Sequence, residues 1–328
     1  MKITRFLKGM LALSLLCGLL LTGCSSSVGD KVIIYSNADD EAVTAIKNAL
    51  DNNGFKDQYL LQTFATSELG GKLLAEGKNI EADLITMSSF YLDSAQDDKN
   101  MFIDLNLSTK TLEQYPSFYS PMTSQEGAII VNTKEMENNK LPTPTCLKDL
   151  AKPIYKDMIS VIDIQSSSTA WLLIQALVDA YGEAGAKEVL KGIYDNAGVH
   201  IESSGSGPIK KVRAGEVAIG FGLRHQAVRD KISGLPIDYV DPTEGNFSLT
   251  ESVAVVDKDN QSNQEKVKQM AECIIKNGRT ELLETYPNPL YVGETSDSIY
   301  KSTYPKVFQE ELSVSLLQKH QKISEESK

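Results

Sequence analysis

Alternating apolar and amphipathic segments constrain the fold of this 328-residue chain more than any other feature. Short apolar runs such as 32–37 (VIIYSN) and 82–87 (ADLITM) are separated by segments with helical periodicity, among them 167–181 and 261–277. Several of the runs are continuously apolar, which is typical of strands covered on both faces. The order of strands and helices therefore predicts an α/β fold, in which mostly parallel sheets are flanked by helices on both sides.

Two further apolar stretches, 127–133 and 250–257, lie where one β–α block gives way to another. Two crossings of this kind imply one lobe inserted within another. Two consecutive domains would instead need a linker, and the nearest proline-rich stretch is 141–145 (LPTPT). We therefore predict a leader over 1–24, a tether over 25–30, a first lobe over 31–130 plus 254–328, and an inserted second lobe over 131–253.

The N-terminus has the pattern of an export signal. Lys2, Arg5 and Lys8 precede an apolar run at 10–21 (MLALSLLCGLLL), which is too short to span a bilayer and predicts a secretory leader. The run ends in LTGC, which resembles the lipobox of bacterial lipoproteins, in which the cysteine becomes the lipidated first residue. An ordinary signal peptide with a nearby cysteine is the alternative. We expect lipidated Cys24 to anchor an exported protein to the outer face of the cell membrane, with its folded part in water.

Charge and cysteine content narrow the classes of partner. The chain has 33 Lys and Arg residues against 44 Asp and Glu residues. Such an acidic chain is poorly suited to neutralising phosphates, so we expect no nucleic-acid partner. Outside the leader only Cys146 and Cys273 remain, and they lack the spacing of a zinc or redox motif. These two cysteines could form one disulfide or remain two free thiols. We expect a monomer with no metal and no cofactor.

Four turns rich in hydroxyl groups and glycine lie where an expected strand is followed by an expected helix. In open α/β sheets such turns gather at the carboxyl ends of strands, where ligands bind, and helix starts favour anions. Each turn alone is more often a structural N-cap than a binding element. Together they come from both the outer blocks and the inserted block, which predicts a cleft lined from two sides. The candidate ligand contacts in these turns are Ser36, Asn37, Thr66, Ser67, Glu68, Ser167, Ser168, Thr169, Ser204 and Ser206.

Charged candidates complete the expected site. Arg224 follows an apolar strand, and its planar fork suits an oxyanion such as a phosphonate, although a surface arginine in a first helical turn is the alternative. Glu251 and Glu68 are candidates to receive an ammonium group. The sequence contains no GxSxG, HExxH or Walker motif and no GxGxxG after the first strand. The three histidines neither support nor exclude a catalytic triad. We therefore expect a binding protein without catalytic residues.

Several of these segments together resemble a known family. They are YSN at 35–37, TSELGGKLLAEGKNIEADLI at 66–85, SSSTAW at 166–171, GSGPIKKVRAGEVAIGFGLRHQA at 205–227 and DPTEGNFSLTESVAVV at 241–256. Across essentially the whole mature chain they resemble the solute-binding lipoproteins of bacterial ABC importers, which have the two-lobed type II periplasmic-binding fold. The resemblance lies in the branch of ferric-ion and 2-aminoethylphosphonate binders. AIGFGLRHQAVRDK with PTEGN and TES is more similar to the aminoethylphosphonate type.

This resemblance implies a function and its alternatives. It implies an extracytoplasmic receptor that closes around a small phosphonate, 2-aminoethylphosphonate in particular, and delivers it to the transmembrane subunits of an ABC permease. Ferric binders of this fold have two adjacent tyrosines after the AGExAIG strand, where this chain has Leu223-Arg224-His225, and no YY pair occurs. A carrier of ferric ion, another oxyanion or another small solute is the alternative within the binding class. A ligand-sensing subunit or an enzyme on the same scaffold is the alternative from a different class.

Overall fold

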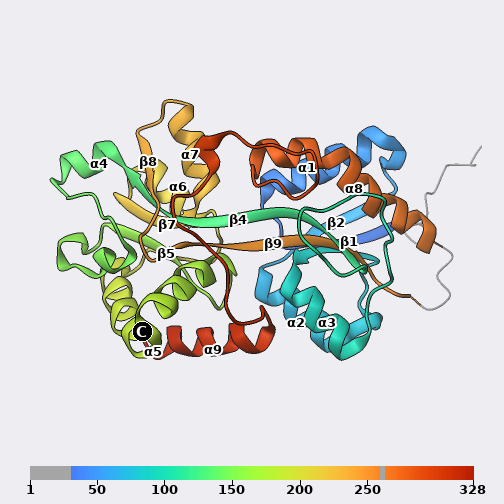
Figure 1. Cartoon of the computed structure of the whole chain (residues 1–328), viewed down its shortest axis with the longest axis horizontal. Helices are drawn as coiled ribbons and strands as arrows, with labels where there is room; N and C mark the ends of the chain where they lie inside the picture. The colour runs from blue at the N-terminus through green and yellow to red at the C-terminus, as the bar shows by residue number, and fades with distance from the viewer. Residues whose placement is uncertain (1–30, 259–262) are drawn as a thin grey trace, which may run out of the picture. The chain divides into compact units, whose positions relative to one another are not determined.

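The computed structural model describes residues 31–258 and 263–328. From Val32 onward these residues form a ten-stranded sheet in the order β2-β1-β3-β9-β4-β7-β5-β6, with β8 beside β4 and β10 beside β9. Figure 1 shows helices on both faces of this sheet. The strands are β1 (Val32–Ser36), β2 (Tyr59–Thr63), β3 (Leu84–Ser88), β4 (Tyr119–Asn132), β5 (Ile159–Ile162), β6 (Ile201–Glu202), β7 (Ile219–Leu223), β8 (Ile237–Val240), β9 (Asn246–Val255) and β10 (Pro305–Lys306).

The helices cover the sheet in pairs. Figure 1 places α1 and α8 on one face of the β1–β3 end and α2 and α3 on the other, while α5 and α9 lie together below the β5–β7 end. The helices are α1 (Asp40–Leu50), α2 (Thr66–Glu76), α3 (Ser89–Lys99), α4 (Thr133–Asn138), α5 (Thr169–Ala197), α6 (Gly207–Ala214), α7 (Arg224–Ile232), α8 (Gln264–Thr285) and α9 (Val314–Glu325). A π-helical turn spans Asp51–Phe55, and short 3₁₀ turns span Gly77–Asn79, Leu147–Ala151, Pro153–Tyr155 and Ser298–Tyr300.

Two long strands join the ends of the sheet. The first part of β4 pairs with β9, and from Gly127 onward β4 pairs with β7. At one end β1 is parallel to β2 and β3, and at the other β5 is parallel to β6 and β7. The crossing strands run antiparallel to each other, β9 is antiparallel to β3 and parallel to β10, and β4 is antiparallel to β7, so the sheet is mixed. The predicted α/β fold with two crossing strands is confirmed, and both strands are longer than the sequence indicated.

A third connection joins the two ends of the sheet near the C-terminus. β10 pairs with β9 at Asn246 and Phe247, and α9 then packs along α5. Trp171 donates from Nε1 to Nδ1 of His320 on α9 at 2.5 Å, and its ring meets Phe308 edge to face. The boundaries of the two lobes stay a prediction.

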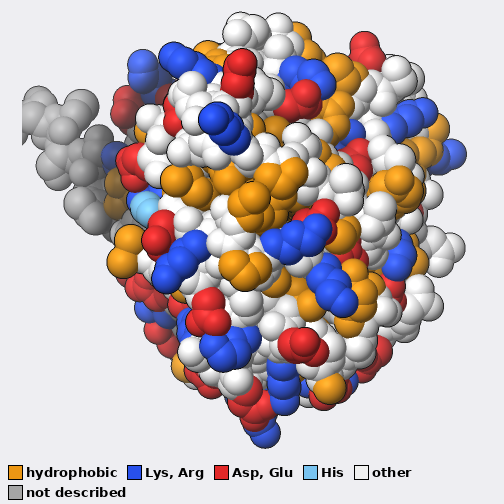
Figure 2. All heavy atoms as spheres, turned by 90° about the vertical axis from the view of Figure 1, so that its left-hand side faces the viewer, with side chains coloured by type: hydrophobic (Ala, Val, Ile, Leu, Met, Phe, Trp, Pro, Cys, Tyr) orange, Lys and Arg blue, Asp and Glu red, His pale blue; other side chains and the backbone are white. Residues whose placement is uncertain are grey.

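The interior is closely filled with apolar side chains. All five residues of β3 are buried, as expected for a strand covered on both faces. Cys146 and Cys273 are both free thiols, and buried Cys273 donates from Sγ to the carbonyl oxygen of Ala49. Figure 2 shows side chains of both charge signs interspersed with apolar ones on the face nearest α4. In the described ranges no helix is long and apolar enough to cross a bilayer.

Two adjacent glycines in α2 allow a matched test of this packing. A Cβ on Gly70 would lie 2.3 Å from the ring of Tyr91 on α3, whereas a Cβ on Gly71 would meet nothing within 4 Å. We expect Gly70→Ala to destabilise the protein by about 1–3 kcal/mol through overpacking. Gly71→Ala should stabilise it by about 0.5–1 kcal/mol, because alanine is the better helix former. Urea unfolding measures both, and similar values for the two variants would contradict the close approach of α2 and α3.

Candidate functional site

A cavity of about 440 Å³ opens where strand ends meet the starts of α1, α2, α5 and α6. Its floor includes Met122, Thr123 and Gln125 of β4 and Glu251 of β9. Its volume lies in the range of small-molecule sites, which is about 300–1,000 Å³. Nine of the twelve ligand contacts expected from the sequence line it: Asn37, Thr66, Glu68, Ser167, Ser168, Thr169, Ser204, Ser206 and Glu251.

Two of the expected contacts point elsewhere for local reasons. Ser36 is buried behind the cavity wall, where its hydroxyl accepts bonds from Thr86 Oγ1 at 2.7 Å and from the Ala38 amide at 3.1 Å. Ser67 lies one residue further along α2 than Thr66 and does not line the cavity. We no longer count Ser36 or Ser67 among the ligand contacts.

Arg224 also lies outside the cavity, and its donors are already used. Its guanidinium forms a two-pronged ion pair with Asp241, at 2.7 Å from Nε and 3.2 Å from Nη2. The remaining N–H groups donate to the carbonyl oxygens of residues 299, 300 and 301. Its plane also lies over the ring of Tyr239, 4.6 Å from the centroid. With all five donors engaged, Arg224 fixes the C-terminal connection and does not fulfil its expected role as an oxyanion ligand.

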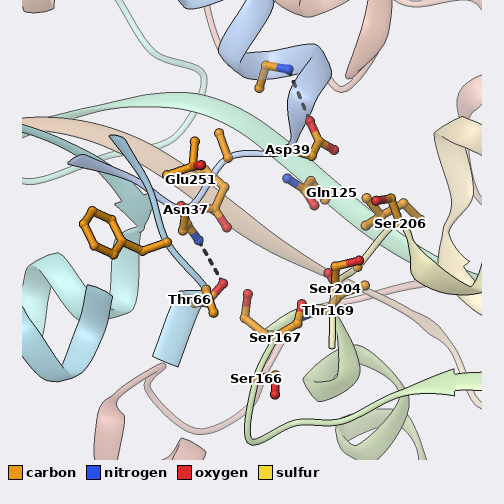
Figure 3. A pocket seen from close by; sticks show the side chains of 18 of the residues that line it. Asn37, Asp39, Thr66, Gln125, Ser166, Ser167, Thr169, Ser204, Ser206 and Glu251 are labelled. Atoms are coloured by element: carbon orange, nitrogen blue, oxygen red, sulfur yellow. Dashed lines mark hydrogen bonds between the residues drawn. The ribbon is translucent and has the colours of Figure 1, made fainter. Parts of the chain in front are cut away.

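One wall of the cavity carries acceptors that have no donor. Glu251 is 6% exposed, and its Oε1 accepts a bond of 2.8 Å from the Ser88 hydroxyl. Within the described chain its Oε2 has no hydrogen-bond partner, and neither does Oδ1 of Asn37. The amide nitrogen of Asn37 donates to Thr66 Oγ1 at 3.1 Å, as Figure 3 shows. Burial raises the pKa of Glu251 to about 7, against the lowering effects of the hydrogen-bonding side chains of Ser88 and Asn37.

Asp39 brings a further carboxylate to this side of the cavity. It caps α1 by accepting from the Ala42 amide at 3.2 Å, and it also accepts a hydrogen bond from the Tyr286 hydroxyl. Burial raises its pKa. Because the start of α1 is already capped by an acid, it offers little to an anionic ligand.

Three helix starts on the other walls have the opposite character. Among the described helices, α2, α5 and α6 begin at the cavity, and the residue just before each helix makes no side-chain capping bond, although at α5 the Thr169 amide donates to Ser167 Oγ at 3.4 Å. Figure 3 shows Thr169, Ser204 and Ser206 across the cavity from Asn37 and Glu251. The hydroxyl groups there and the first-turn amides that remain free are donors, and the helix dipole adds a partial positive charge. At α5 and α6 the amides of Ala170, Trp171 and Gly207 already donate to backbone carbonyl oxygens. These walls can therefore bind an anionic group, while the Glu251 wall accepts hydrogen atoms.

In the described part of the chain, the ionisable side chains that line the cavity are four carboxylates and one lysine. No tyrosine, histidine or cysteine occurs among the described residues that line it. The described ranges also contain no group of three or more His, Cys, Asp or Glu side chains placed to hold a metal.

Residues 80–293 match the protein family described as bacterial extracellular solute-binding protein. This match covers more than half of the chain. The chain belongs to this family. The solute-binding protein is also 26% identical, over 251 residues, to a protein of Haemophilus influenzae described as uncharacterized. That alignment covers 70% of this chain and 69% of its relative.

Solved structures show how widely the fold of this solute-binding protein is shared. It resembles the periplasmic binding protein AfuA from Actinobacillus pleuropneumoniae, solved with fructose-6-phosphate, with a TM-score of 0.72 and 18% identity over 90% of this chain and 96% of that one. Iron-bound HitA from Pseudomonas aeruginosa matches with the same TM-score and identity, and the alignment covers 90% of this chain and 99% of that one. A periplasmic thiamin-binding protein matches with a TM-score of 0.72 and 15% identity, and the alignment covers 90% of this chain and 95% of that one. These likenesses establish the type II periplasmic-binding fold.

Family membership fixes the broad role of the solute-binding protein. It implies export, a small solute as ligand and ABC permease subunits as partners. The family and the neighbours described above are binding proteins. Cys24 lies outside the described residues.

Sequence reasoning missed several residues that line the cavity. Thr123 and Gln125 alternate along β4, a pattern that marks one face of a strand but not what that face meets. Asp39 and Asp40 follow the YSN turn, and an acid just before a helix is an N-cap signal that was available. Lys210, in α6, had no distinguishing signal. The further residues missed are Ala38, Ala42, Thr63, Phe64, Ala65, Met122, Ser166, Ser203, Gly205 and Leu223.

Proposed function

We propose that this solute-binding protein captures a small aminoalkylphosphonate, 2-aminoethylphosphonate in particular, and delivers it to an ABC permease. The observation that carries the proposal is the buried Glu251 oxygen without a partner, which faces a cavity whose other walls are helix starts without side-chain caps. A ligand with an ammonium group at one end and an oxyanion at the other can donate to Glu251 and accept from the donors at the helix starts. A simple anion satisfies only the helix starts.

The ammonium end belongs beside Glu251. A buried acceptor without a donor costs roughly 1–3 kcal/mol, and more when it is charged. An ammonium group supplies three donors, enough for Glu251 Oε2 and Asn37 Oδ1 together. Glu68 also lines the cavity but lies partly exposed on α2, so a bond to it is worth less. Glu251 is therefore the acid we assign to the amine.

The phosphonate end belongs at the starts of α5 and α6. Ser167, Ser168, Thr169, Ser204 and Ser206 bring hydroxyl groups there beside the uncapped turns. Charge-assisted hydrogen bonds to three oxyanion oxygens are short and strong. The bound fructose-6-phosphate of AfuA supports the view that this fold can hold a phosphorylated solute. Iron, which HitA holds, is less well matched, because the cavity lining has no phenolate or imidazole among the described residues.

Capture and delivery follow from the crossing strands and the N-terminus. We propose that bending of β4 and β9 closes the cavity around the ligand and that the permease recognises the closed form. β4 has a register shift between Pro121 and Thr123, where bending is easiest. We also propose that lipidated Cys24 keeps the protein at the membrane, close to its permease.

Thermal unfolding of residues 25–328 with a ligand panel tests the proposal. A ligand at 100 times its dissociation constant should add about 2.7 kcal/mol to the stability of the native state. We expect 2-aminoethylphosphonate to raise the melting temperature most, with smaller shifts from phosphonoacetate, phosphate, sulfate and fructose 6-phosphate and none from putrescine. Stabilisation by ferric citrate with a red-brown colour, in the absence of any shift with phosphonates, would overturn the assignment and leave the fold intact.

A further inference from the structure

Lys210 is the one lysine or arginine among the described residues that line the cavity. It lies in the first half of α6, close to Ser204 and Ser206, where the phosphonate is proposed to bind. Its ammonium group is exposed, and no ion-pair or hydrogen-bond partner for it occurs in the described part of the chain. Nearly every other lysine near α6 and α7 is paired, as Lys211 and Lys231 illustrate. An unpaired cation beside an uncapped helix start is available for a ligand.

The acidic side chains around the cavity make the positive charge of Lys210 important for the binding of an anion. Four acidic side chains line the space, namely Asp39, Asp40, Glu68 and Glu251. The helix starts and hydroxyl groups bind oxyanions of every kind, since they offer dipoles and not full charges. A second negative charge on the ligand is repelled by the four acids unless a full positive charge lies beside it.

We infer that Lys210 is the specificity residue that selects a doubly charged phosphonate over singly charged anions of the same size. This inference rests on the proposed function, because it assigns the charge of the ligand at that same site. A sulfonate is the discriminating case, because it is tetrahedral with three oxygens like a phosphonate but carries one charge. 2-Aminoethylphosphonate and 2-aminoethylsulfonate therefore differ at the bound end chiefly in charge.

The neighbouring lysine supplies a matched control. Lys211 is the next residue of α6 and does not line the cavity. It donates to Glu216 at 2.9 Å and lies 3.6 Å from Glu202. Lys210→Met and Lys211→Met remove the same charge from the same helix, so a general effect of net charge or helix stability appears in both. Only a direct effect on the ligand separates them.

Isothermal titration calorimetry with both ligands at pH 7.5 tests the inference. We expect Lys210→Met to weaken 2-aminoethylphosphonate binding about tenfold, the effect of one charge-assisted hydrogen bond, and to change 2-aminoethylsulfonate binding less than twofold. Lys211→Met should leave both within twofold of the unmodified protein. Equal losses for the two ligands, or equal behaviour of the two variants, would overturn the inference while leaving the proposed function standing. Failure of the unmodified protein to bind 2-aminoethylphosphonate would instead overturn the proposed function.

A pH series distinguishes a direct role of Lys210 in binding from a structural one, because only a direct role changes how ligand affinity depends on pH. A phosphate monoester takes its second charge at about pH 6, and a phosphonate ionises in the same region, whereas a sulfonate keeps one charge throughout. Between pH 5.5 and 8, the sulfonate keeps its charge, so its affinity reports the cavity carboxylates with raised pKa values, Glu251 and Asp39. Affinity for the phosphonate should rise more steeply, and Lys210→Met should reduce that slope to the value for the sulfonate. An unchanged slope in the variant would contradict the role of Lys210.

Discussion

Replacing Glu251 by glutamine is expected to weaken 2-aminoethylphosphonate binding by about 100-fold, because it removes the buried carboxylate that faces the ammonium group. Truncating one partner of a buried, hydrogen-bonded charge pair costs roughly 2–5 kcal/mol, and 100-fold corresponds to about 2.7 kcal/mol. Glutamine keeps the shape of the side chain and can still accept from Ser88, which donates to Glu251 Oε1. Calorimetric titration at pH 7.5 measures the loss.

Glu68→Gln is the matched control, since Glu68 lines the same cavity from a partly exposed position. We expect a change of less than threefold, the range of exposed ion pairs. The pH dependence has a definite sign. Because the pKa of Glu251 is raised to about 7, the affinity of the unmodified protein should increase as pH rises from 5.5 to 8. A larger loss for Glu68→Gln than for Glu251→Gln would move the amine to α2 and contradict our assignment.

The same variant should make the ligand-free protein more stable at high pH. A carboxyl group whose pKa is about 7 in the folded state and 4.5 ordinarily costs stability progressively as pH rises through that interval. The full cost above pH 7 is about 3 kcal/mol at 1.36 kcal/mol per unit. Glu251→Gln should therefore raise the melting temperature at pH 8 and change it little at pH 4.5. Equal shifts at both pH values would show that burial does not hold the proton on Glu251.

Replacing Arg224 by methionine is expected to destabilise the protein by about 3–5 kcal/mol while leaving ligand affinity within threefold. Both side chains of the Arg224–Asp241 pair are almost fully buried, at 4% and 6% exposed. Removing one partner of a buried ion pair leaves an uncompensated charge, which is the costly case. Urea unfolding gives the stability, and titration of the folded variant at low temperature gives the affinity.

The double variant Arg224→Met with Asp241→Leu separates charge burial from loss of the connection. Replacing both charges by apolar groups removes the unpaired carboxylate, so part of the lost stability should return. The bonds to carbonyl oxygens of residues 299–301 stay lost, and recovery should therefore be incomplete. A 100-fold loss of affinity in Arg224→Met, with stability unchanged, would restore Arg224 as a ligand contact.

The sequence predicted which residues line the cavity better than it predicted which residues a side chain contacts. Turns at strand ends are local features, so Ser167 and Thr169 could be placed from hydroxyl groups that follow an apolar run. Arg224 could not, because the fork that suits an oxyanion suits Asp241 and three carbonyl oxygens equally well, and only the fold brings those carbonyls to it. Lys210 was missed because most helical lysines are solvated.

The prediction of helices was limited for the same reason, because the sequence does not show which elements pack against each other. The periodicity of α9 indicates an amphipathic helix but not which helix it covers, so its packing on α5 was not foreseen. The helix expected at 167–181 is the first part of α5, which is broken at Gly182, whose φ of 67° only glycine adopts easily. Local breaks were therefore predicted well, and long-range contacts were not.

The docking of α9 on α5 also sets an order for folding. Trp171 lies in the first turn of α5, next to the cavity residues Ser168 and Thr169, and it is covered by Phe308 and His320 from the end of the chain. An exported chain that emerges N-terminus first cannot complete this core until its last residues arrive. A molecule whose residues 308–320 are not yet exported therefore lacks the side chains that cover Trp171, next to residues that line the cavity.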